Sequence, residues 1–172
     1  MKHLFFTGPV GAGKSTALRR LLKETGWRCG GFSTVWSGDT LHLLPYGANQ
    51  SACAAENRVA MRTGRCCQAD PAAFDRLGPV LLRQTGVDCM VLDELGFLEG
   101  SSPAFQAAVL ALLRGNVPVL GVIKPRPTPF LDAVRACPGV VVAEVTGENR
   151  DALPQIWMGE LLWERCITGS RT

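Results

Sequence analysis

An eight-residue segment near the N-terminus constrains the fold of this chain more than any other feature. Residues 8–15 read Gly-Pro-Val-Gly-Ala-Gly-Lys-Ser and fit the pattern G-x-x-x-x-G-K-[ST] completely. An apolar run, Leu4–Thr7, precedes the segment, and a helical pattern follows it from Gly13 or Lys14 to Gly26. Average composition would produce the pattern by chance in about 1% of chains this long. A loop between a strand and a helix that cradles phosphate is therefore favoured over a merely structural glycine loop.

The loop pattern also predicts what its individual residues do. The Lys14 ammonium would reach the β- and γ-phosphates of a nucleotide, and the Ser15 hydroxyl would bind Mg²⁺. We group Thr16 with the binding loop, although we expect it to support the turn or to pack rather than to bind directly. The expected nucleotide-binding residues of the loop are Gly8, Pro9, Val10, Gly11, Ala12, Gly13, Lys14, Ser15 and Thr16.

Two acids mark the second half of the predicted site. Asp93 and Glu94 stand at the end of the apolar run Cys89–Asp93. In an open α/β sheet, ligands bind beyond the carboxyl ends of the strands, so both acids should face the same crevice as the loop. We expect Asp93 to hold Mg²⁺ and Glu94 to orient or deprotonate the attacking water. An acidic pair after a strand is otherwise a turn or a helix cap, and the loop favours the catalytic interpretation. Glu94 and Lys14 are the predicted catalytic residues.

The rest of the chain alternates short apolar runs with helical patterns, which predicts a three-layer α/β fold with a mostly parallel central sheet. We expect one domain over residues 1–172. Helices should begin at Asp70-Pro71, Ser102-Pro103 and Thr128-Pro129, where an N-cap residue precedes a proline, and a last helix should run from Asp151 to Cys166. The other expected parallel strands are Val117–Ile123 and Val140–Val145.

Two segments depart from this plan. Gly31–Trp36 and Leu41–Tyr46 should form an antiparallel hairpin appended to the parallel sheet. Residues 47–68 are ambiguous, and a short helix from Ser51 to Met61 is one interpretation. In that helix Arg58, Arg62 and Arg65 would share a face, either as a solvated basic surface or as a lid that contacts phosphate.

Polar residues after two further strands are weaker candidates for the site. Asn149 and Arg150 follow the last strand and could reach the base or ribose, and the alternative is a helix cap and a surface arginine. Lys124 and Arg126 follow Val117–Ile123, and either could neutralise charge on the γ-phosphate; otherwise they are solvated loop charges.

Composition narrows the class of protein. A net charge of +3 over 172 residues gives no electrostatic reason to expect a nucleic-acid-binding or membrane-surface protein. No stretch approaches the ~20 apolar residues that span a bilayer, and the short apolar N-terminus is not a signal peptide. We therefore expect a cytoplasmic protein. The seven cysteines contain no Cys-x-x-Cys pair, so neither zinc nor a disulfide framework is predicted.

Three elements resemble a specific family, the small THEP-type nucleoside triphosphatases of the RecA-like branch. Asp93-Glu94-Leu95-Gly96 with Glu99 resembles the family's Asp-Glu-Ile-Gly-x-Met-Glu signature. Val145–Arg150 resembles its Val-Thr-x-Glu-Asn-Arg element, and Gly31–Thr34 is similar to its Gly-Phe-Tyr-Thr strand. In this branch one strand separates the loop strand from the acidic strand. The implied order is the last strand, Leu4–Thr7, Val117–Ile123, Cys89–Asp93.

The resemblance implies magnesium-dependent hydrolysis of ATP, GTP and other nucleoside triphosphates, slow and with little base preference. Leu95 and Leu98 replace an isoleucine and a methionine of the family, Ser33 replaces a tyrosine, and residues 47–68 match poorly. Because of these departures, the resemblance does not assign residues to a base pocket or to a lid. From the residues alone, two alternatives remain: a nucleotide or small-molecule kinase with the same loop, and a nucleotide-binding switch or adaptor.

Overall fold

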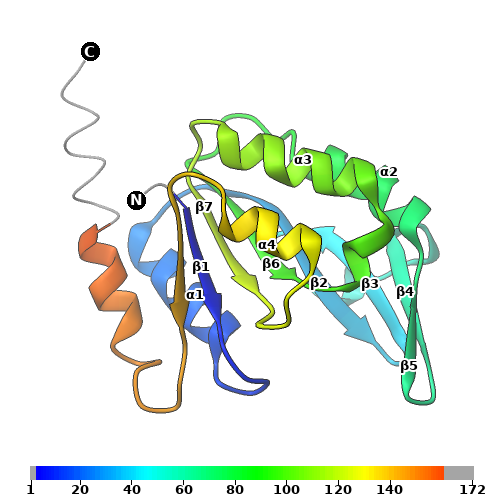
Figure 1. Ribbon diagram of the computed structural model, residues 1–172, viewed down its shortest axis with the longest axis horizontal. Helices are drawn as coiled ribbons and strands as arrows, with labels where there is room; N and C mark the ends of the chain where they lie inside the picture. Colours follow the sequence, from blue (N-terminus) through cyan, green and yellow to red (C-terminus); the bar gives the residue numbers. More distant parts are fainter. Residues whose placement is uncertain (1–2, 161–172) are drawn as a thin grey trace.

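The computed structural model describes residues 3–160, which form an eight-stranded sheet in the order β5-β4-β3-β2-β6-β7-β1-β8 (Figure 1). The strands are β1 (His3–Thr7), β2 (Cys29–Ser37), β3 (Thr40–Pro45), β4 (Arg58–Thr63), β5 (Cys66–Ala69), β6 (Cys89–Leu95), β7 (Val119–Ile123) and β8 (Val140–Glu144).

The strands β8, β1, β7, β6 and β2 run parallel to one another. The predicted order of four parallel strands, β8-β1-β7-β6, is confirmed, with β7 between the loop strand β1 and the acidic strand β6. Strand β6 continues to Leu95, two residues beyond the predicted end, so both acids lie within it. The carboxyl ends of β1, β7 and β8 all point to the bottom edge of the molecule in Figure 1.

The helices begin where the sequence predicts. They are α1 (Lys14–Thr25), α2 (Pro71–Leu81), α3 (Pro103–Arg114) and α4 (Pro129–Arg135), and residues 153–160 are also helical. Asp70 caps α2 by accepting a hydrogen bond from the Ala73 N–H (3.0 Å), and Thr128 caps α4 through the Leu131 N–H (3.1 Å). The predicted end of the last helix at Cys166 lies outside the described residues. Within residues 3–160, no helix is both long enough and apolar enough to cross a bilayer.

Two apolar cores, one on each face of the sheet, confirm the predicted three layers. Side chains alternate between the two faces along β1, so Phe5 packs in one core, whereas Leu4 and Phe6 pack in the other. Helices α2, α3 and α4 cover the first face and α1 the second (Figure 1). Aromatic rings dominate the first core, namely those of Phe5, Phe32, Phe74, Phe105 and Phe130.

The predicted hairpin is confirmed as β2 and β3, but the helix expected from Ser51 to Met61 is wrong. Two short 3₁₀ turns, Gln50–Ala52 and Ala55–Asn57, lead into β4, which pairs with β3 and, through a turn at Gly64, with β5. Val59 and Ala60 are buried in the strand. The register of β4 with β3 shifts between Ala60 and Arg58, so the two-residue alternation of a regular strand is interrupted there.

Candidate active site

The glycine loop joins the carboxyl end of β1 to the N-terminus of α1. Gly8 has a φ of 135°, and a Cβ atom there would lie 2.4 Å from the Val145 carbonyl oxygen of the next strand segment. Only glycine fits that position. Gly13 is the N-cap of α1 in a left-handed conformation, so the helix begins at Lys14 with its unpaired N–H groups and positive end facing the loop. The local geometry is that of an anion cradle.

Lys14 lies across this loop. Its side chain is buried, and its Nζ atom donates hydrogen bonds to the carbonyl oxygens of Gly8 (3.0 Å) and Pro9 (2.7 Å). The two contacts hold the ammonium group over the concave side of the loop. That is the position from which a lysine can contact the outer phosphates of a nucleotide.

Ser15 and Asp93, 78 residues apart, meet at the end of the loop. The Ser15 Oγ atom donates a hydrogen bond to Asp93 Oδ1 at 2.9 Å. Burial raises the pKa of Asp93, and the hydrogen bond from Ser15 opposes that shift. A hydroxyl and a carboxylate oxygen side by side suit a hard cation such as Mg²⁺, which completes its shell with waters and phosphate oxygens. Among residues 3–160, no group of three or more His, Cys, Asp or Glu side chains could hold a metal ion.

Glu94 reaches the same edge because β6 is irregular there. Asp93 pairs with Val122 of β7 and Leu95 with Ile123, so the register shifts at Glu94. The Glu94 carboxylate lies 3.3 Å from the Lys124 ammonium, which follows β7. The loop, the two acids and Lys124 therefore come together from β1, β6 and β7.

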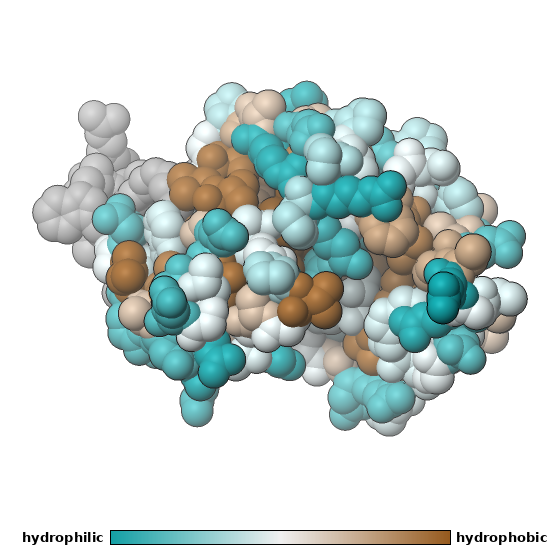
Figure 2. Space-filling view, turned by 60° about the horizontal axis from the view of Figure 1, so that its bottom comes forward, coloured by the Kyte–Doolittle hydropathy of each residue, from teal (hydrophilic) through white to brown (hydrophobic). Residues whose placement is uncertain are grey.

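The loop, Glu94 and Lys124 line a cavity of about 660 Å³. Its size is within the range of sites for small molecules and cofactors. Thr16 is exposed and lines the cavity, so the expectation that it packs is wrong. Figure 2 brings this edge of the molecule forward and shows hydrophilic residues interspersed with smaller hydrophobic groups. The lining residues are Gly8, Val10, Gly11, Gly13, Lys14, Ser15, Thr16, Glu94, Phe97, Lys124, Pro125 and Arg126.

Asn149 and Arg150 differ in what their side chains contact. Asn149 Oδ1 accepts a hydrogen bond from the Thr146 N–H (2.8 Å), and its Nδ2 donates to the Glu144 carbonyl (2.9 Å). Its amide is thus engaged in the turn, as the capping alternative predicts, rather than extended toward a base or ribose. The Arg150 side chain lies against the loop, with its Cδ atom 3.3 Å from where a Cβ of Gly13 would be. Arg150 is half exposed at the rim of the loop.

Sequence reasoning assigned no role to Phe97 and used Glu99 only as part of a family signature. Phe97 is exposed in the cavity, with the Lys124 ammonium 5.2 Å and the Arg126 guanidinium 5.5 Å from its ring centroid. Glu99 is only 3% exposed, and its carboxylate accepts a hydrogen bond from the Gly96 N–H (3.1 Å). Burial raises the pKa of Glu99 to about 7, although backbone hydrogen bonds oppose the shift. The position of these two residues could have indicated a role, because Phe97 and Glu99 follow shortly after the acidic strand β6.

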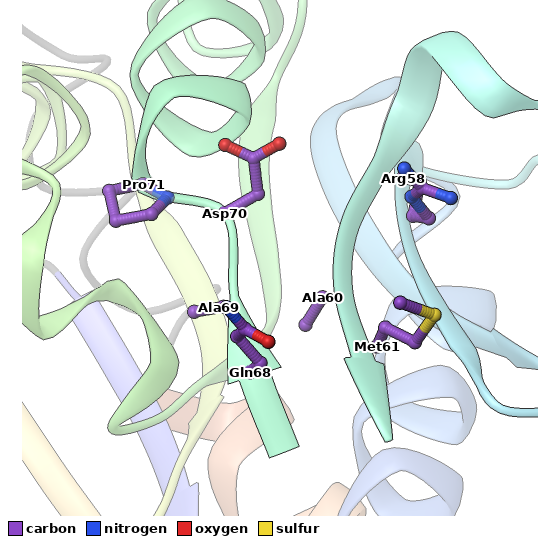
Figure 3. Close-up of a pocket in the computed structure, with 7 residues that line it drawn as sticks. All are labelled: Arg58, Ala60, Met61, Gln68, Ala69, Asp70 and Pro71. Atoms are coloured by element: carbon purple, nitrogen blue, oxygen red, sulfur yellow. The ribbon is translucent and has the colours of Figure 1, made fainter. Parts of the chain in front are cut away.

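A separate cavity of about 360 Å³ lies between β4, β5 and the start of α2 (Figure 3). Ala60 and Ala69 are paired across the two strands, and their small side chains leave the hollow. Arg58 and Met61 border it from β4, while Asp70 borders it from the helix. The Asp70 carboxylate already caps α2, so the polar groups of this hollow do not converge on its centre.

Comparison of the sequence with known proteins identifies one family. A family model described as NTPase matches residues 3–158. A cancer-related nucleoside-triphosphatase homolog from Bos taurus is 33% identical, with 90% of this chain and 94% of the relative covered. The human cancer-related nucleoside-triphosphatase is 31% identical, with 88% and 92% covered. A nucleoside-triphosphatase THEP1 from Natranaerobius thermophilus is 24% identical, with 89% and 92% covered.

Two solved structures share the fold. THEP1 from Aquifex aeolicus superposes with a TM-score of 0.69 at 22% identity, covering 89% of this chain and 95% of that one. The solution structure of a human cancer-related nucleoside triphosphatase gives a TM-score of 0.67 at 24% identity, with both chains fully covered at 100%. At these identities the two matches support the overall fold alone.

Proposed function

This chain belongs to the THEP1-type NTPase family and is a nucleoside triphosphatase, and we propose that it hydrolyses ATP, GTP and other nucleoside triphosphates with Mg²⁺ and little base preference. One observation supports the proposal most strongly. The buried Lys14, the Ser15–Asp93 pair and Glu94 converge from separate elements on the carboxyl edge of the parallel strands. That edge is where α/β proteins bind their ligands.

We propose that the phosphates lie in the glycine loop. The backbone N–H groups of the loop and of the start of α1 would bind phosphate oxygens, and Lys14 would bind the β- and γ-phosphates. Ser15 and Asp93 would hold Mg²⁺, which supplies positive charge to the phosphate oxygens when it is bound.

Glu94 is our candidate for positioning the attacking water. It lies beside the phosphate loop, one residue after Asp93, and its carboxylate is held by Lys124 at 3.3 Å. From there it would orient the water in line with the γ-phosphorus and accept its proton as the oxygen attacks. Lys124 and Arg126, both lining the cavity, would stabilise negative charge that develops on the phosphate oxygens.

Tolerance for different bases agrees with the surroundings of the loop. The Asn149 amide, a group that could read a base edge, is engaged with backbone atoms of its own turn. Arg150 lies at the rim, where its half-exposed side chain could contact ribose or base without selecting among bases. We therefore assign nucleotide affinity chiefly to the phosphates.

The test is phosphate release from ATP, GTP, CTP and UTP by the purified protein, with Mg²⁺ and without an acceptor. We expect release from all four, with loss of activity in excess chelator and recovery when Mg²⁺ is restored. Release from a single triphosphate would contradict base tolerance, and release in the presence of chelator would contradict the metal requirement. Asp93→Asn should raise the Mg²⁺ concentration needed for half-maximal activity, since one charged ligand is lost.

Tight nucleotide binding without release from any triphosphate would favour the switch or adaptor alternative. A cytoplasmic location, a single domain over residues 1–172 and the absence of a nucleic-acid partner stay predictions from the sequence.

A further inference from the structure

A third cavity, of about 240 Å³, is lined by both acids and adjoins the loop cavity. It shares Ser15, Glu94 and Lys124 with the loop cavity, so the two spaces meet at the predicted position of the γ-phosphate. The remaining wall comes from β2, β3 and the segment after β6. These additional lining residues are Thr34, Trp36, Leu41, Asp93, Gly96, Leu98 and Glu99.

Part of this cavity has no use in hydrolysis. The part beside Ser15 and Asp93 would hold the proposed Mg²⁺ and its waters together with the attacking water, which occupies about 30 Å³ in the liquid. The whole space, about 240 Å³, is just below the usual range for small-molecule sites. Its wall also contains the apolar side chains of Trp36, Leu41 and Leu98, which do nothing to orient a water.

The aromatic part of this wall is held in place. The Arg62 guanidinium of β4 lies 4.3 Å from the centroid of the Trp36 ring. Trp36 is nevertheless 38% exposed, so part of its surface stays accessible. A ring supported on one side by a cation and open elsewhere is a suitable platform for a planar group.

Glu99 adds a polar group away from the phosphate loop. It is buried at the cavity wall, where its carboxylate accepts a hydrogen bond from the Gly96 N–H. Burying an acid is unfavourable unless its oxygens are used. The proposed hydrolysis assigns no role to Glu99, so its carboxyl group adds a polar group to the wall of this cavity.

We propose that this cavity binds a second substrate, a small uncharged alcohol with a planar ring, and that the γ-phosphoryl group is transferred to its hydroxyl oxygen. The ring would pack on Trp36 and Leu98, with the hydroxyl directed toward Glu94 and Lys124. This inference rests on the proposed function, because the phosphoryl donor occupies the loop cavity. Hydrolysis is then the reaction that occurs when water replaces the alcohol.

The transfer step balances without any further reactant. The alcohol oxygen forms a bond to the γ-phosphorus, and the bond from that phosphorus to the β,γ-bridging oxygen breaks. The nucleoside diphosphate leaves with the bridging oxygen, and the hydroxyl proton passes to Glu94 and then to solvent. The products are a phosphate monoester, a nucleoside diphosphate and one proton.

The experiment uses ATP labelled at the γ-phosphate, Mg²⁺ and four probe alcohols, namely thymidine, adenosine, pyridoxine and benzyl alcohol. Labelled phosphate monoester and free labelled phosphate are separated and quantified. We expect at least one probe to yield a monoester. Trp36→Ala should lower the ratio of monoester to free phosphate up to about tenfold, the value of one aromatic contact. Met61→Ala, an exposed side chain of the same sheet region outside this cavity, is the matched control and should leave the ratio unchanged.

The outcomes separate this inference from the function on which it rests. Phosphate release without monoester from any of the four probes would overturn the acceptor site and leave the triphosphatase intact. A probe that slows release without becoming phosphorylated would overturn the transfer as well. Monoester formation that is equal in wild type and Trp36→Ala would place the acceptor elsewhere and contradict the assigned cavity. Absence of both release and nucleotide binding would overturn the proposed function itself.

Discussion

The parallel strands and the β4–β5 hairpin each carry a cavity, but the polar groups of the two cavities are arranged in opposite ways. In the loop cavity, Lys14 and Ser15 of α1 and Glu94 of β6 face a common space although they are far apart in the sequence. In the hollow between β4 and β5, Asp70 is engaged with the helix that it caps, and the space exists because Ala60 and Ala69 are small (Figure 3).

Strand direction explains the difference. Parallel strands place their carboxyl ends at one edge, so residues that follow β1, β6 and β7 meet although they are far apart in the sequence. The hairpin of β4 and β5 runs back and forth, so the hollow is bordered by residues close together in the sequence. Convergence of polar groups from distant segments therefore identifies the site better than cavity volume does.

The largest expected contrast is between cations at the two cavities. Lys14→Ala should lower kcat/KM for ATP by on the order of 10²–10³-fold, because a buried donor to the phosphates is removed. Arg58→Ala, at the β4–β5 hollow, should leave kcat/KM nearly unchanged. Steady-state phosphate release from both variants measures the contrast. Equal losses of kcat/KM in the two variants would contradict the assignment of nucleotide binding to the loop cavity alone.

The next prediction compares how much a glycine-to-alanine substitution destabilises the protein in each of the two regions. Gly8→Ala would place a Cβ atom 2.4 Å from the Val145 carbonyl oxygen at a φ of 135°. We expect it to lower the free energy of unfolding by about 3 kcal/mol or more, from strained backbone and overpacking together. Gly64→Ala, in the β4–β5 turn, has a φ of 60° and no atom within 4 Å, so about 1 kcal/mol of backbone strain is expected. Urea unfolding compares the two, and equal destabilisation would refute the close approach at Gly8.

Glu99 offers a pH-dependent test of burial at the site. Because its pKa in the folded state is about 7 and its ordinary value is 4.5, the folded protein retains the proton as pH rises between these values while the unfolded chain loses it. Its contribution to stability is therefore present below pH 4.5 and lost as pH rises through 7.

Glu99→Gln removes this titration and leaves all others in place. The unfolding free energy of wild type relative to the variant should fall by up to about 3 kcal/mol between pH 4 and pH 8, at roughly 1.4 kcal/mol per pH unit of pKa difference. Paired urea titrations at the two pH values measure this change. A constant difference would show that Glu99 is not buried as an acid in the folded state.

The parallel half of this fold was predictable because its signals are local. The loop pattern fixes a strand before it and a helix after it, and proline after Asp70 or Thr128 marks a helix start. Asp93 could be assigned because an apolar run ends in acids. Strand β4 was missed because its buried residues, Val59 and Ala60, are adjacent and do not alternate with exposed ones as in a regular half-buried strand.

Contacts between residues far apart in the chain could not be predicted from the sequence alone. Nothing local indicates that Lys124 pairs with Glu94 or that Arg62 lies over Trp36. The register shift of β6, which brings two adjacent acids to one edge, is likewise a property of its pairing with β7. These features determine which residues can perform the chemistry.

Glu94→Gln, with nucleotide binding and phosphate release measured on the same preparation, tests the central claim most directly. The substitution keeps the size of the side chain and removes its ability to accept the proton of water. We predict that affinity for ATP with Mg²⁺ is largely retained while kcat falls by about 10²–10⁴-fold, the usual contribution of a general base. Release at the wild-type rate from Glu94→Gln would contradict the assignment of Glu94 as the residue that positions the attacking water.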